Sequence, residues 1–448
     1  MFRSYLPHTE ADRKAMLAAI GLEMEEQLFD VIPPQLRFNR MLNLPASLPE
    51  AELVRHTRQL AGRNADLLQY TCFLGAGAYD HYIPSVVDHV TGRSEFYTSY
   101  TQYQPEAAQG YLQALWEFQT MICELTGMEV ANASMYDAAT AAAEAAMMAC
   151  GATGRSRLLV AKTVHPHYRQ VLSTYGRDRK YRIQEIEYRQ GTTDLERLKV
   201  ATGPEIAAII VQSPNFFGCI EELDAAARMA HAAGALLIVL ADPVSLGILA
   251  SPGSFGADIV AGEGQGLGLP ISFGGPYLGF LATTAKWMRR LPGRIIGQTT
   301  DADGKRGFVL TLQAREQHIR REKANSNICS NEALCALRAA VYLSAAGKDG
   351  IQRIAGLSLQ KAHYACRELA KLPGCRPVFA APFFKEFVIA TSRPVAEVNA
   401  VLFENQIIGG LDLARYYPEL AGCMLLCVTE NRTRDEIDRL AAVLGGIL

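Results

Sequence analysis

ADIVAGEGQGLGLPISFGGPYLGFLA, residues 257–282, holds two apolar runs on either side of a glycine-rich turn. This is the pattern of a chain that leaves a buried strand, makes a functional turn and returns to a sheet. In one large class of enzymes, a lysine in such a turn holds a cofactor covalently. The middle of this turn is Gln265, whose amide nitrogen is not nucleophilic because its lone pair is delocalised into the carbonyl.

Buried strands and helices alternate along the chain around this turn. The predicted strands are 157–162, 207–212, 235–241, 258–262 and 277–282, with helices at 168–176 and 224–234. This alternation predicts a mainly parallel sheet covered on both faces by helices. Two further helices are predicted at 104–127 and 137–151, where Gly127 and Gly151 mark the helix ends.

The pattern divides the chain into three parts. Residues 1–65 form a helical extension that includes a proline-broken segment, 31–49, which is either an arm on another surface or a linker. Residues 66–330 form the large α/β domain. Residues 331–448 form a small α+β domain, in which strands at 384–392 and 422–430 flank a helix at 394–406.

The composition is that of a globular protein with a sizeable core. The chain has 448 residues, 49% of them apolar, and a formal net charge of −2, so we expect no binding to nucleic acid. Its ten cysteines lack C-x-x-C spacing, so we expect no metal site. We find no apolar run of about 18 residues, the length that spans a membrane. Without a signal peptide, the expected location is the cytoplasm.

Several polar residues fall at the carboxyl ends of the predicted strands, where open α/β sheets bind ligands. Ser134 begins the segment SMYD at a helix start, which suits a phosphate. His165 follows the first strand, Asp242 ends the third, and Gln265 lies 23 residues later. This order is typical of the aminotransferase-like, fold type I pyridoxal phosphate enzymes. There the aspartate holds a proton on the pyridine nitrogen, a ring stacks on the cofactor and a lysine binds it.

Lysine is missing from the position that this fold requires. The nearest downstream lysine is Lys286, which lies beyond the next strand at a helix start and is expected to be a solvated surface residue. Without a cofactor, a buried Asp242 needs another cationic or donor partner.

Long segments resemble the glycine decarboxylase family, the P-protein of the glycine cleavage system. The resemblance lies in residues 95–141, 211–223, 273–280 and 315–334, and extends from SYLPHTEADRKAML near the N-terminus to the C-terminus. Members of this family are single chains of two similar halves or pairs of separate subunits. This chain is similar to the first half, the alpha subunit.

The resemblance implies that the cofactor lysine is carried by a beta subunit. Pyridoxal phosphate is then bound to the partner and not covalently to this chain, in an assembly of two alpha and two beta chains. The family decarboxylates glycine and transfers the aminomethyl group to the lipoyl group of H-protein. Two alternatives remain: an independent pyridoxal phosphate enzyme that uses another lysine, and a purely structural or regulatory subunit.

Two segments are predicted to reach the partner's site. The first is tyrosine-rich and contains Tyr97, Tyr100 and Tyr103; simple intersubunit packing is the alternative. The second is a loop with Asn325, Ser326 and Asn327, which could instead cap a helix. Ser134, His165 and Asp242 are expected to be vestigial.

The stretch 286–323 is strongly basic. It has ten Lys or Arg and four Asp or Glu, a net charge of +6. It is either a solvated basic face or a docking site for an acidic carrier such as H-protein.

Overall fold

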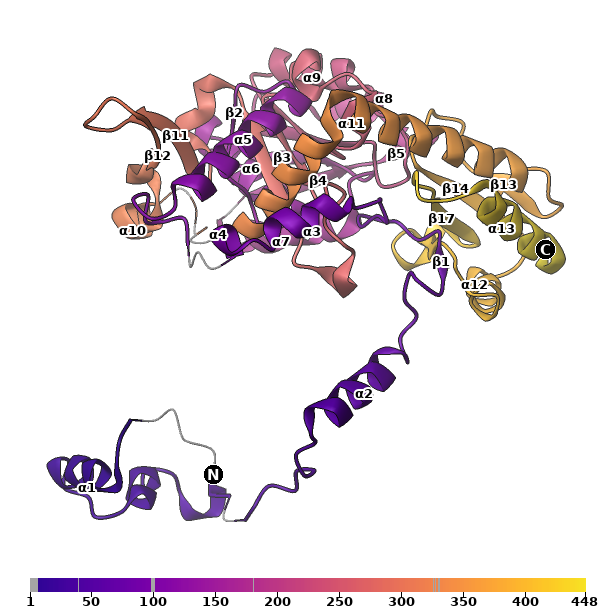
Figure 1. Cartoon of the computed structure of the whole chain (residues 1–448). Coiled ribbons are helices and arrows are strands. Elements are labelled where there is room, and N and C mark those ends of the chain that lie inside the picture. Colours follow the sequence, from indigo (N-terminus) through magenta and orange to yellow (C-terminus); the bar gives the residue numbers. More distant parts are fainter. Residues whose placement is uncertain are drawn as a thin grey trace. The chain divides into compact units, whose positions relative to one another are not determined.

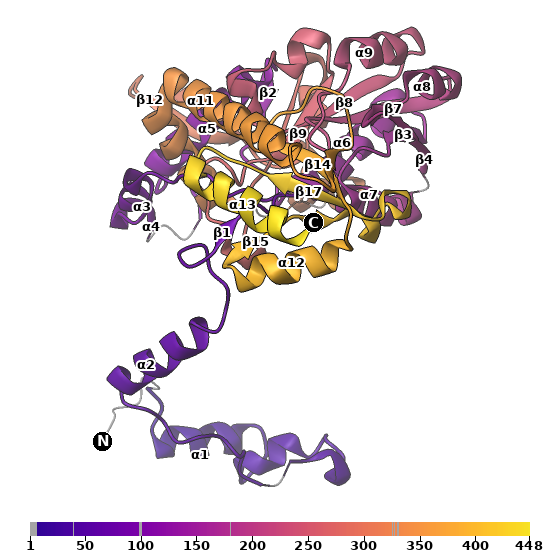
Figure 2. The ribbon, with the colours of Figure 1, turned by 90° about the vertical axis from the view of Figure 1, so that its right-hand side faces the viewer.

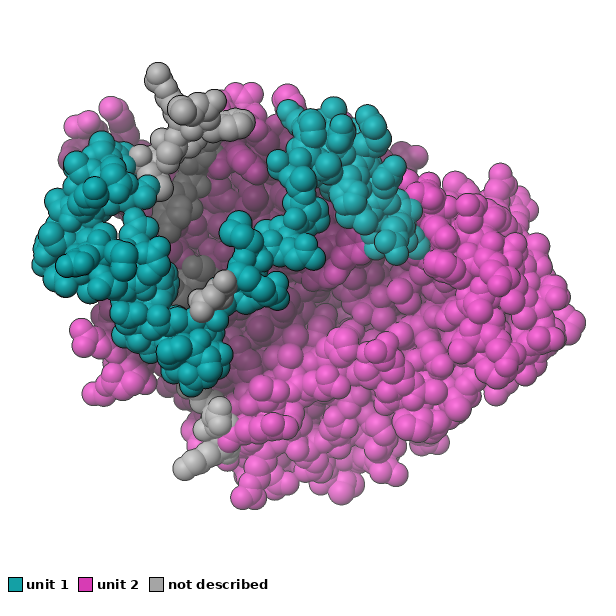
Figure 3. All heavy atoms as spheres, turned by 90° about the horizontal axis from the view of Figure 1, so that it is seen from below, with its two compact units in different colours: residues 1–65 teal, residues 66–448 magenta. Residues whose placement is uncertain are grey.

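The structure is a computed structural model that describes residues 7–38, 40–97, 101–179, 181–324, 326, 328 and 331–448 (Figure 1). The chain forms two compact units, residues 1–65 and 66–448, which are coloured separately in Figure 3. The further division at residue 330 remains a prediction.

The first unit consists of short helices and extended chain. Helices α1 (Glu10–Ala19) and α2 (Glu50–Ala61) are joined through two 3-10 turns, Glu25–Phe29 and Pro34–Leu36. A capping box starts α1, since Thr9 Oγ1 accepts a hydrogen bond from Asp12 N at 3.3 Å and the Asp12 carboxylate accepts one from Thr9 N at 2.7 Å. None of the described residues of this unit, 7–38 and 40–65, is buried, so they form no core of their own.

A seven-stranded sheet organises the second unit, in the order β2-β10-β9-β8-β7-β3-β4. Its strands are β2 (Val130–Ala131), β3 (Arg157–Ala161), β4 (Arg182–Ile186), β7 (Ile206–Ser213), β8 (Leu236–Ala241), β9 (Ile259–Glu263) and β10 (Gly279–Thr283). The strands from β9 to β4 are parallel, and β10 is antiparallel to both β9 and β2. The predicted mainly parallel sheet is therefore confirmed.

The first helices of this unit are α3 (Ser85–Thr91), α4 (Ser94–Tyr97), α5 (Gln109–Thr126), α6 (Ala138–Thr153), α7 (Pro166–Arg179), α8 (Leu195–Ala201) and α9 (Leu223–Ala232). Helices α5, α6, α7 and α9 pack on the sheet, whereas α3 packs on α11 (Ala333–Leu369) and α8 packs on α9. Helix α5 ends at Gly127 as predicted. The predicted end of α6 at Gly151 is wrong, because the left-handed residue that caps this helix is Gly154, with φ 68°.

The C-terminal part of the unit begins with helix α11 (Ala333–Leu369). Gly347 has a non-helical conformation, with φ 61°, and separates α11 into two helical segments. A four-stranded sheet follows, in the order β13-β14-β17-β16. Its strands are β13 (Cys375–Pro377), β14 (Glu386–Thr391), β16 (Leu411–Asp412) and β17 (Cys423–Cys427); helices α12 (Val395–Glu404) and α13 (Arg434–Ile447) lie beside it (Figure 2).

Some short elements had no counterpart in the sequence prediction. The hairpin of β11 (Ile295–Thr300) and β12 (Arg306–Thr311) lies within the basic stretch, where charge obscures the strand pattern. Others include β1 (Thr71–Cys72), which pairs with β15 (Ile407–Ile408), the β5 (Tyr188–Arg189) and β6 (Thr192–Thr193) pair, and the one-turn helix α10 (Gln317–Arg320). Strands β2, β4, β13 and β16 and helices α3, α4 and α8 were not predicted either. Among the described residues, we find no helix with the length and apolar character that crossing a membrane requires.

Candidate functional site

Asp242, at the carboxyl end of β8, forms an ion pair with a lysine from the C-terminal sheet. The Lys385 ammonium lies 2.7 Å from Asp242 Oδ2, and the two side chains are 2% and 14% exposed. The other carboxylate oxygen of Asp242 accepts a hydrogen bond from Val244 N at 3.0 Å. Asp242 therefore has the cationic partner that its burial requires.

Lys385 is held by groups on three sides. Its Nζ lies 2.9 Å from His81 Nε2 and 3.5 Å from the centre of the Tyr79 ring. Because an ammonium only donates, His81 Nε2 accepts, and His81 Nδ1 donates to Glu430 Oε2 at 2.6 Å. Burial opposes the charge of Glu430, but its hydrogen bonds from His81 and from Tyr82 N outweigh burial and lower the pKa of Glu430 to about 2. Glu430, His81, Lys385 and Asp242 are thus joined in sequence by three contacts, and a donor meets an acceptor in each of them.

Gln265, at the predicted cofactor-lysine position, is 1% exposed and completely hydrogen-bonded. Its Oε1 accepts from Tyr79 N at 2.8 Å, and its Nε2 donates to Tyr79 O at 3.0 Å and to Leu269 O at 2.8 Å. The amide therefore joins the glycine-rich turn to the loop of residues 75–82, and has no free group for chemistry.

The N-terminus of α6, where a phosphate was expected, is capped by two carboxylates of the chain. Asp137 Oδ1 accepts from Thr140 N at 2.7 Å, and Glu263 Oε2 accepts from Ala138 N at 3.0 Å. Burial raises the pKa of Glu263 to about 7, against its backbone hydrogen bonds, and the charge of Asp137 raises it further. Ser134 does not reach this cap: its hydroxyl is buried and has no hydrogen-bond partner in the described structure.

His165 faces an aromatic ring of the chain. Its ring stacks on that of Tyr168, with centroids 4.5 Å apart and an angle of 23° between the planes. His165 Nε2 donates to Ala76 O at 2.9 Å, and its Nδ1 accepts from His167 N at 3.1 Å. Burial lowers the pKa of His165 to about 4, which fits this neutral, fully bonded ring.

A pyridoxal phosphate does not fit among these residues. The described residues leave a cavity of about 20 Å³, lined by Tyr79, Tyr168 and Asp242 among others. This volume holds about one water molecule. The predicted aspartate, stacking ring and helix N-terminus are all engaged within the chain, and Gln265 stands where the sequence pattern predicts a cofactor lysine. We call these residues, with Lys385 and Glu263, the strand-end site.

The sequence interpretation missed Lys385, Glu263, Tyr79 and Tyr168. One signal was present: Lys385 and Glu386 interrupt the apolar run FFKEFVIA, which is otherwise a buried strand. Two adjacent charges in such a run require partners, but the run does not show where those partners lie. Glu386 finds them in loop 75–82, where its carboxylate accepts from Ala76 N at 2.6 Å and Tyr79 Oη at 2.8 Å.

The tyrosine-rich segment lies at a separate cavity of about 560 Å³. Tyr97, Tyr103 and Asn331 line it, and none of its lining residues belongs to the cavity at Asp242. Gln102 Nε2 donates to Asn331 Oδ1 at 2.6 Å and joins this segment to the start of α11. Tyr97 is 70% exposed, whereas the Arg294 guanidinium lies 4.6 Å from the centre of the Tyr103 ring.

Part of the second predicted segment is also described. Ser326 is buried, and its Oγ accepts from Ile328 N at 3.1 Å, as in a turn. Tyr100, Asn325 and Asn327 lie outside the described residues.

The basic stretch 286–323 is not all solvated. Arg294 and Glu316 form a buried ion pair, and Arg315 donates to Gly293 O at 2.6 Å. Burial, and next the charge of Arg294, lower the pKa of Arg315 to about 10. Lys286 is exposed, as expected.

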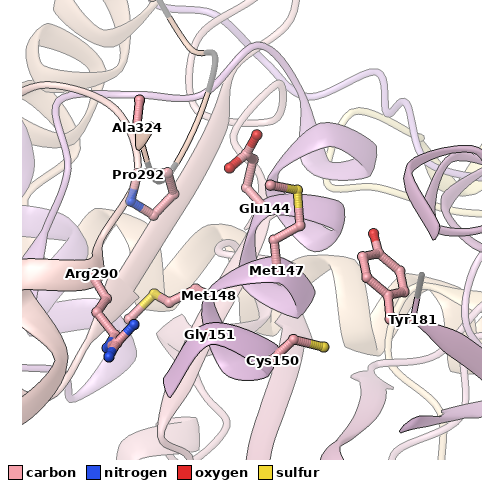
Figure 4. A pocket seen from close by; sticks show the side chains of 9 residues that line it. All are labelled: Glu144, Met147, Met148, Cys150, Gly151, Tyr181, Arg290, Pro292 and Ala324. Atoms are coloured by element: carbon pink, nitrogen blue, oxygen red, sulfur yellow. The ribbon is translucent and has the colours of Figure 1, made fainter. Parts of the chain in front are cut away.

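A third cavity, of about 270 Å³, lies beside α6 (Figure 4). Figure 4 shows Arg290 on one side of the helix and Tyr181 on the other, with Met147, Met148 and Cys150 between them. Ala324, next to the predicted loop, also lines it. No predicted site residue lines this cavity.

Comparison with known proteins finds one family that matches nearly the whole chain. The family model of the glycine cleavage system P-protein matches residues 3–444. The chain is 57% identical over 99% of its length to the probable glycine dehydrogenase (decarboxylating) subunit 1 of Moorella thermoacetica, covering 100% of that protein. It is 55% identical to the protein of the same name from Geobacillus kaustophilus, with 99% of each chain covered.

Comparison with solved structures identifies the same family and the same fold. The crystal structure of glycine decarboxylase (P-protein) of the glycine cleavage system in inhibitor-bound form is 43% identical, covers 100% of both chains and has a TM-score of 0.90. A sphingosine-1-phosphate lyase from Burkholderia pseudomallei, 15% identical with a TM-score of 0.67, shares the fold.

Proposed function

The chain belongs to the P-protein family of the glycine cleavage system, and we propose that it is subunit 1 of a glycine dehydrogenase (decarboxylating) whose reactive lysine lies in a second subunit. One observation carries this proposal: Gln265 takes the lysine position and all of its amide groups are hydrogen-bonded within the chain. A subunit without the lysine needs a partner that has it.

The assembly proposed has two alpha and two beta chains. The beta subunit binds pyridoxal phosphate, which supplies the electron sink for loss of carbon dioxide from glycine. The aminomethyl group then passes to the lipoyl group of H-protein, for which the exposed part of the basic stretch 286–323 is the candidate contact. We expect this enzyme in the cytoplasm.

This chain contributes a wall of the partner's site. The cavity at Tyr97 and Tyr103 supports this role, because it gathers hydroxyl and amide groups that plain apolar packing does not need. Asn331 brings the start of α11 to the same cavity, directly after the loop that contains Asn325, Ser326 and Asn327. The contacts of Tyr103 with Arg294 favour packing for that residue, so Tyr97 is the stronger candidate.

An independent pyridoxal phosphate enzyme is less well supported. Lys385 is the lysine that the fold brings to the strand-end site, and it is paired with Asp242, which would have to bind the pyridine nitrogen. One lysine cannot both occupy this carboxylate and bind the far end of the same ring.

The test is co-expression of both subunits followed by borohydride reduction in the presence of pyridoxal phosphate. Mass spectrometry should find the pyridoxyl-lysine on the partner, and glycine–bicarbonate exchange should require both chains. A stoichiometric label on this chain, or full exchange by the partner alone, would refute the proposal.

A further inference from the structure

We propose that side chains of this protein stand where pyridoxal phosphate would bind in its fold, and that they hold loop 75–82 and strand β14 against the sheet in the absence of any cofactor. Ser134 apart, the residues taken above as vestigial therefore have a present structural role. The inference concerns this chain alone and does not depend on which subunit carries the lysine.

The cationic contact is replaced by Lys385. In this fold, the strand-end aspartate faces a protonated ring nitrogen; here Asp242 faces an ammonium at 2.7 Å. The ammonium also lies over the Tyr79 ring and donates to His81, so a second cation has no room at this carboxylate.

The aromatic and anionic contacts are replaced as well. The His165 ring, which was expected to stack on the cofactor, stacks on Tyr168. The N–H of Ala138 at the start of α6, expected for a phosphate, donates to Glu263. The contacts expected at Asp242, at His165 and at the start of α6 thus have internal equivalents, and a phosphate at α6 would meet the two carboxylates Asp137 and Glu263.

These replacements connect segments that are distant in sequence. Asp242 directly follows β8, Lys385 directly precedes β14, and Glu430 follows β17. Loop 75–82 lies between them and bonds to both sides, through Tyr79 to Gln265 and through His81 to Lys385. In a fold whose ligand cleft lies at the strand ends, this network closes the cleft.

A double-mutant cycle on the full-length chain tests the central pair. Asp242→Asn keeps the acceptor for Val244 N but removes the charge, and Lys385→Met keeps the length of the side chain. Each single variant leaves one buried charge unpaired and should lower the melting temperature by about 4–6 °C. The double variant should lose clearly less than the sum of the two singles.

The chain offers a matched control pair. Lys371 and Glu368 lie 2.7 Å apart at the surface, and the Lys371 side chain is 66% exposed. The cycle of Glu368→Gln and Lys371→Met should show almost no coupling. Additive losses in the Asp242–Lys385 cycle, or coupling no larger than in the control, would overturn the proposal.

A second measurement probes the vacated position directly. In Lys385→Ala, ethylammonium chloride should raise the melting temperature more than potassium chloride at the same concentration. Lys385→Ala/Asp242→Asn and the wild-type chain should not distinguish the two salts. Equal responses to both salts in Lys385→Ala would contradict a cation site at Asp242.

Pyridoxal phosphate itself gives the last measurement. The isolated wild-type chain should leave the absorbance of added cofactor unchanged. Saturable binding in the micromolar range would show that the strand-end site is open, and would refute the inference even if glycine–bicarbonate exchange still depends on the partner's lysine.

Discussion

Gln265 and the backbone of Tyr79 exchange two hydrogen bonds, with N–O distances of 2.8 and 3.0 Å, across 186 positions of sequence. This reciprocal pair joins the glycine-rich turn to loop 75–82, in the way that two strands exchange bonds in a sheet. Because Gln265 is buried and Tyr79 is half-buried, loss of the acceptor would leave the Tyr79 N–H without its partner.

Gln265→Lys should therefore destabilise the chain without creating a cofactor site. A lysine donates but cannot accept, so the variant loses the bond to Tyr79 N and buries an amine, at a cost of about 2–5 kcal/mol. Urea denaturation should show the loss, and borohydride reduction with pyridoxal phosphate should leave residue 265 unlabelled. Lys286→Gln, at an exposed position, is the control for both measurements. Carbon dioxide release from labelled glycine by Gln265→Lys alone would contradict this prediction.

Stability should fall as pH rises through neutrality, in part because of Glu386. Burial raises the pKa of this carboxyl from its ordinary 4.5 to about 7, more than its bonds to Ala76 and Tyr79 and the charge of Lys385 lower it. A folded-state pKa above the unfolded value contributes stability that is complete below about pH 4.5 and is lost as pH rises through 7. The size of this contribution is on the order of 3 kcal/mol.

Glu386→Gln isolates this contribution. The free energy of unfolding of the variant, relative to wild type, should increase between pH 5 and pH 8. Glu263, whose pKa is also about 7, and His165, whose lowered pKa acts in the opposite sense, remain in both proteins and cancel in the difference. A difference that stays constant with pH would show that Glu386 does not titrate in this range.

Deletion of residues 31–49 should leave the second unit folded but weaken binding to the partner. Val31 and Met41 are 89% and 90% exposed, and Leu36 and Leu44 are each 71% exposed, which is a large apolar surface for one segment. Size-exclusion chromatography of the co-expressed subunits should show dissociation, while circular dichroism of the deleted chain stays unchanged. An intact complex would identify the segment as a simple linker.

Tyr97→Phe should lower glycine–bicarbonate exchange more than it lowers the stability of the complex. If its hydroxyl makes one hydrogen bond in the partner's site, the exchange rate should fall by a few-fold when the acceptor is neutral. The rate should fall by up to roughly a hundred-fold when the acceptor is charged. Exchange and thermal melting of the complex should be measured on the same samples. Tyr103→Phe, with the ring already packed against Arg294, should have a smaller effect.

Tyr82→Phe is the control for these tyrosines, since Tyr82 is 62% exposed and lies outside the cavity at Tyr97. Tyr100→Phe, Asn325→Ala and Asn327→Ala extend the series along the same segments. Wild-type exchange in intact complexes of all five variants would make this chain a scaffold only.

Local patterns in the sequence predicted the buried strands β3, β7, β8, β9 and β10 and the end of α5 at Gly127. The run 236–241 is apolar because β8 is buried on both faces, and Gly127 ends α5 because glycine adopts a left-handed conformation without strain. The position of Gln265 follows in the same way, since a strand fixes which residues come directly after it. Such features depend on residues that are close together in the sequence, so the sequence alone is enough to predict them.

The partners of the buried charges required the folded chain. Asp242 needs a cation, but its sequence neighbours offer none, and Lys385 reaches it from 143 positions away because β14 and the end of β8 meet across loop 75–82. The same holds for Glu263 at the start of α6 and for Gln265 against Tyr79. Such a pairing depends on how separate elements pack against one another in the folded chain. Local spacing and periodicity in the sequence do not record that packing.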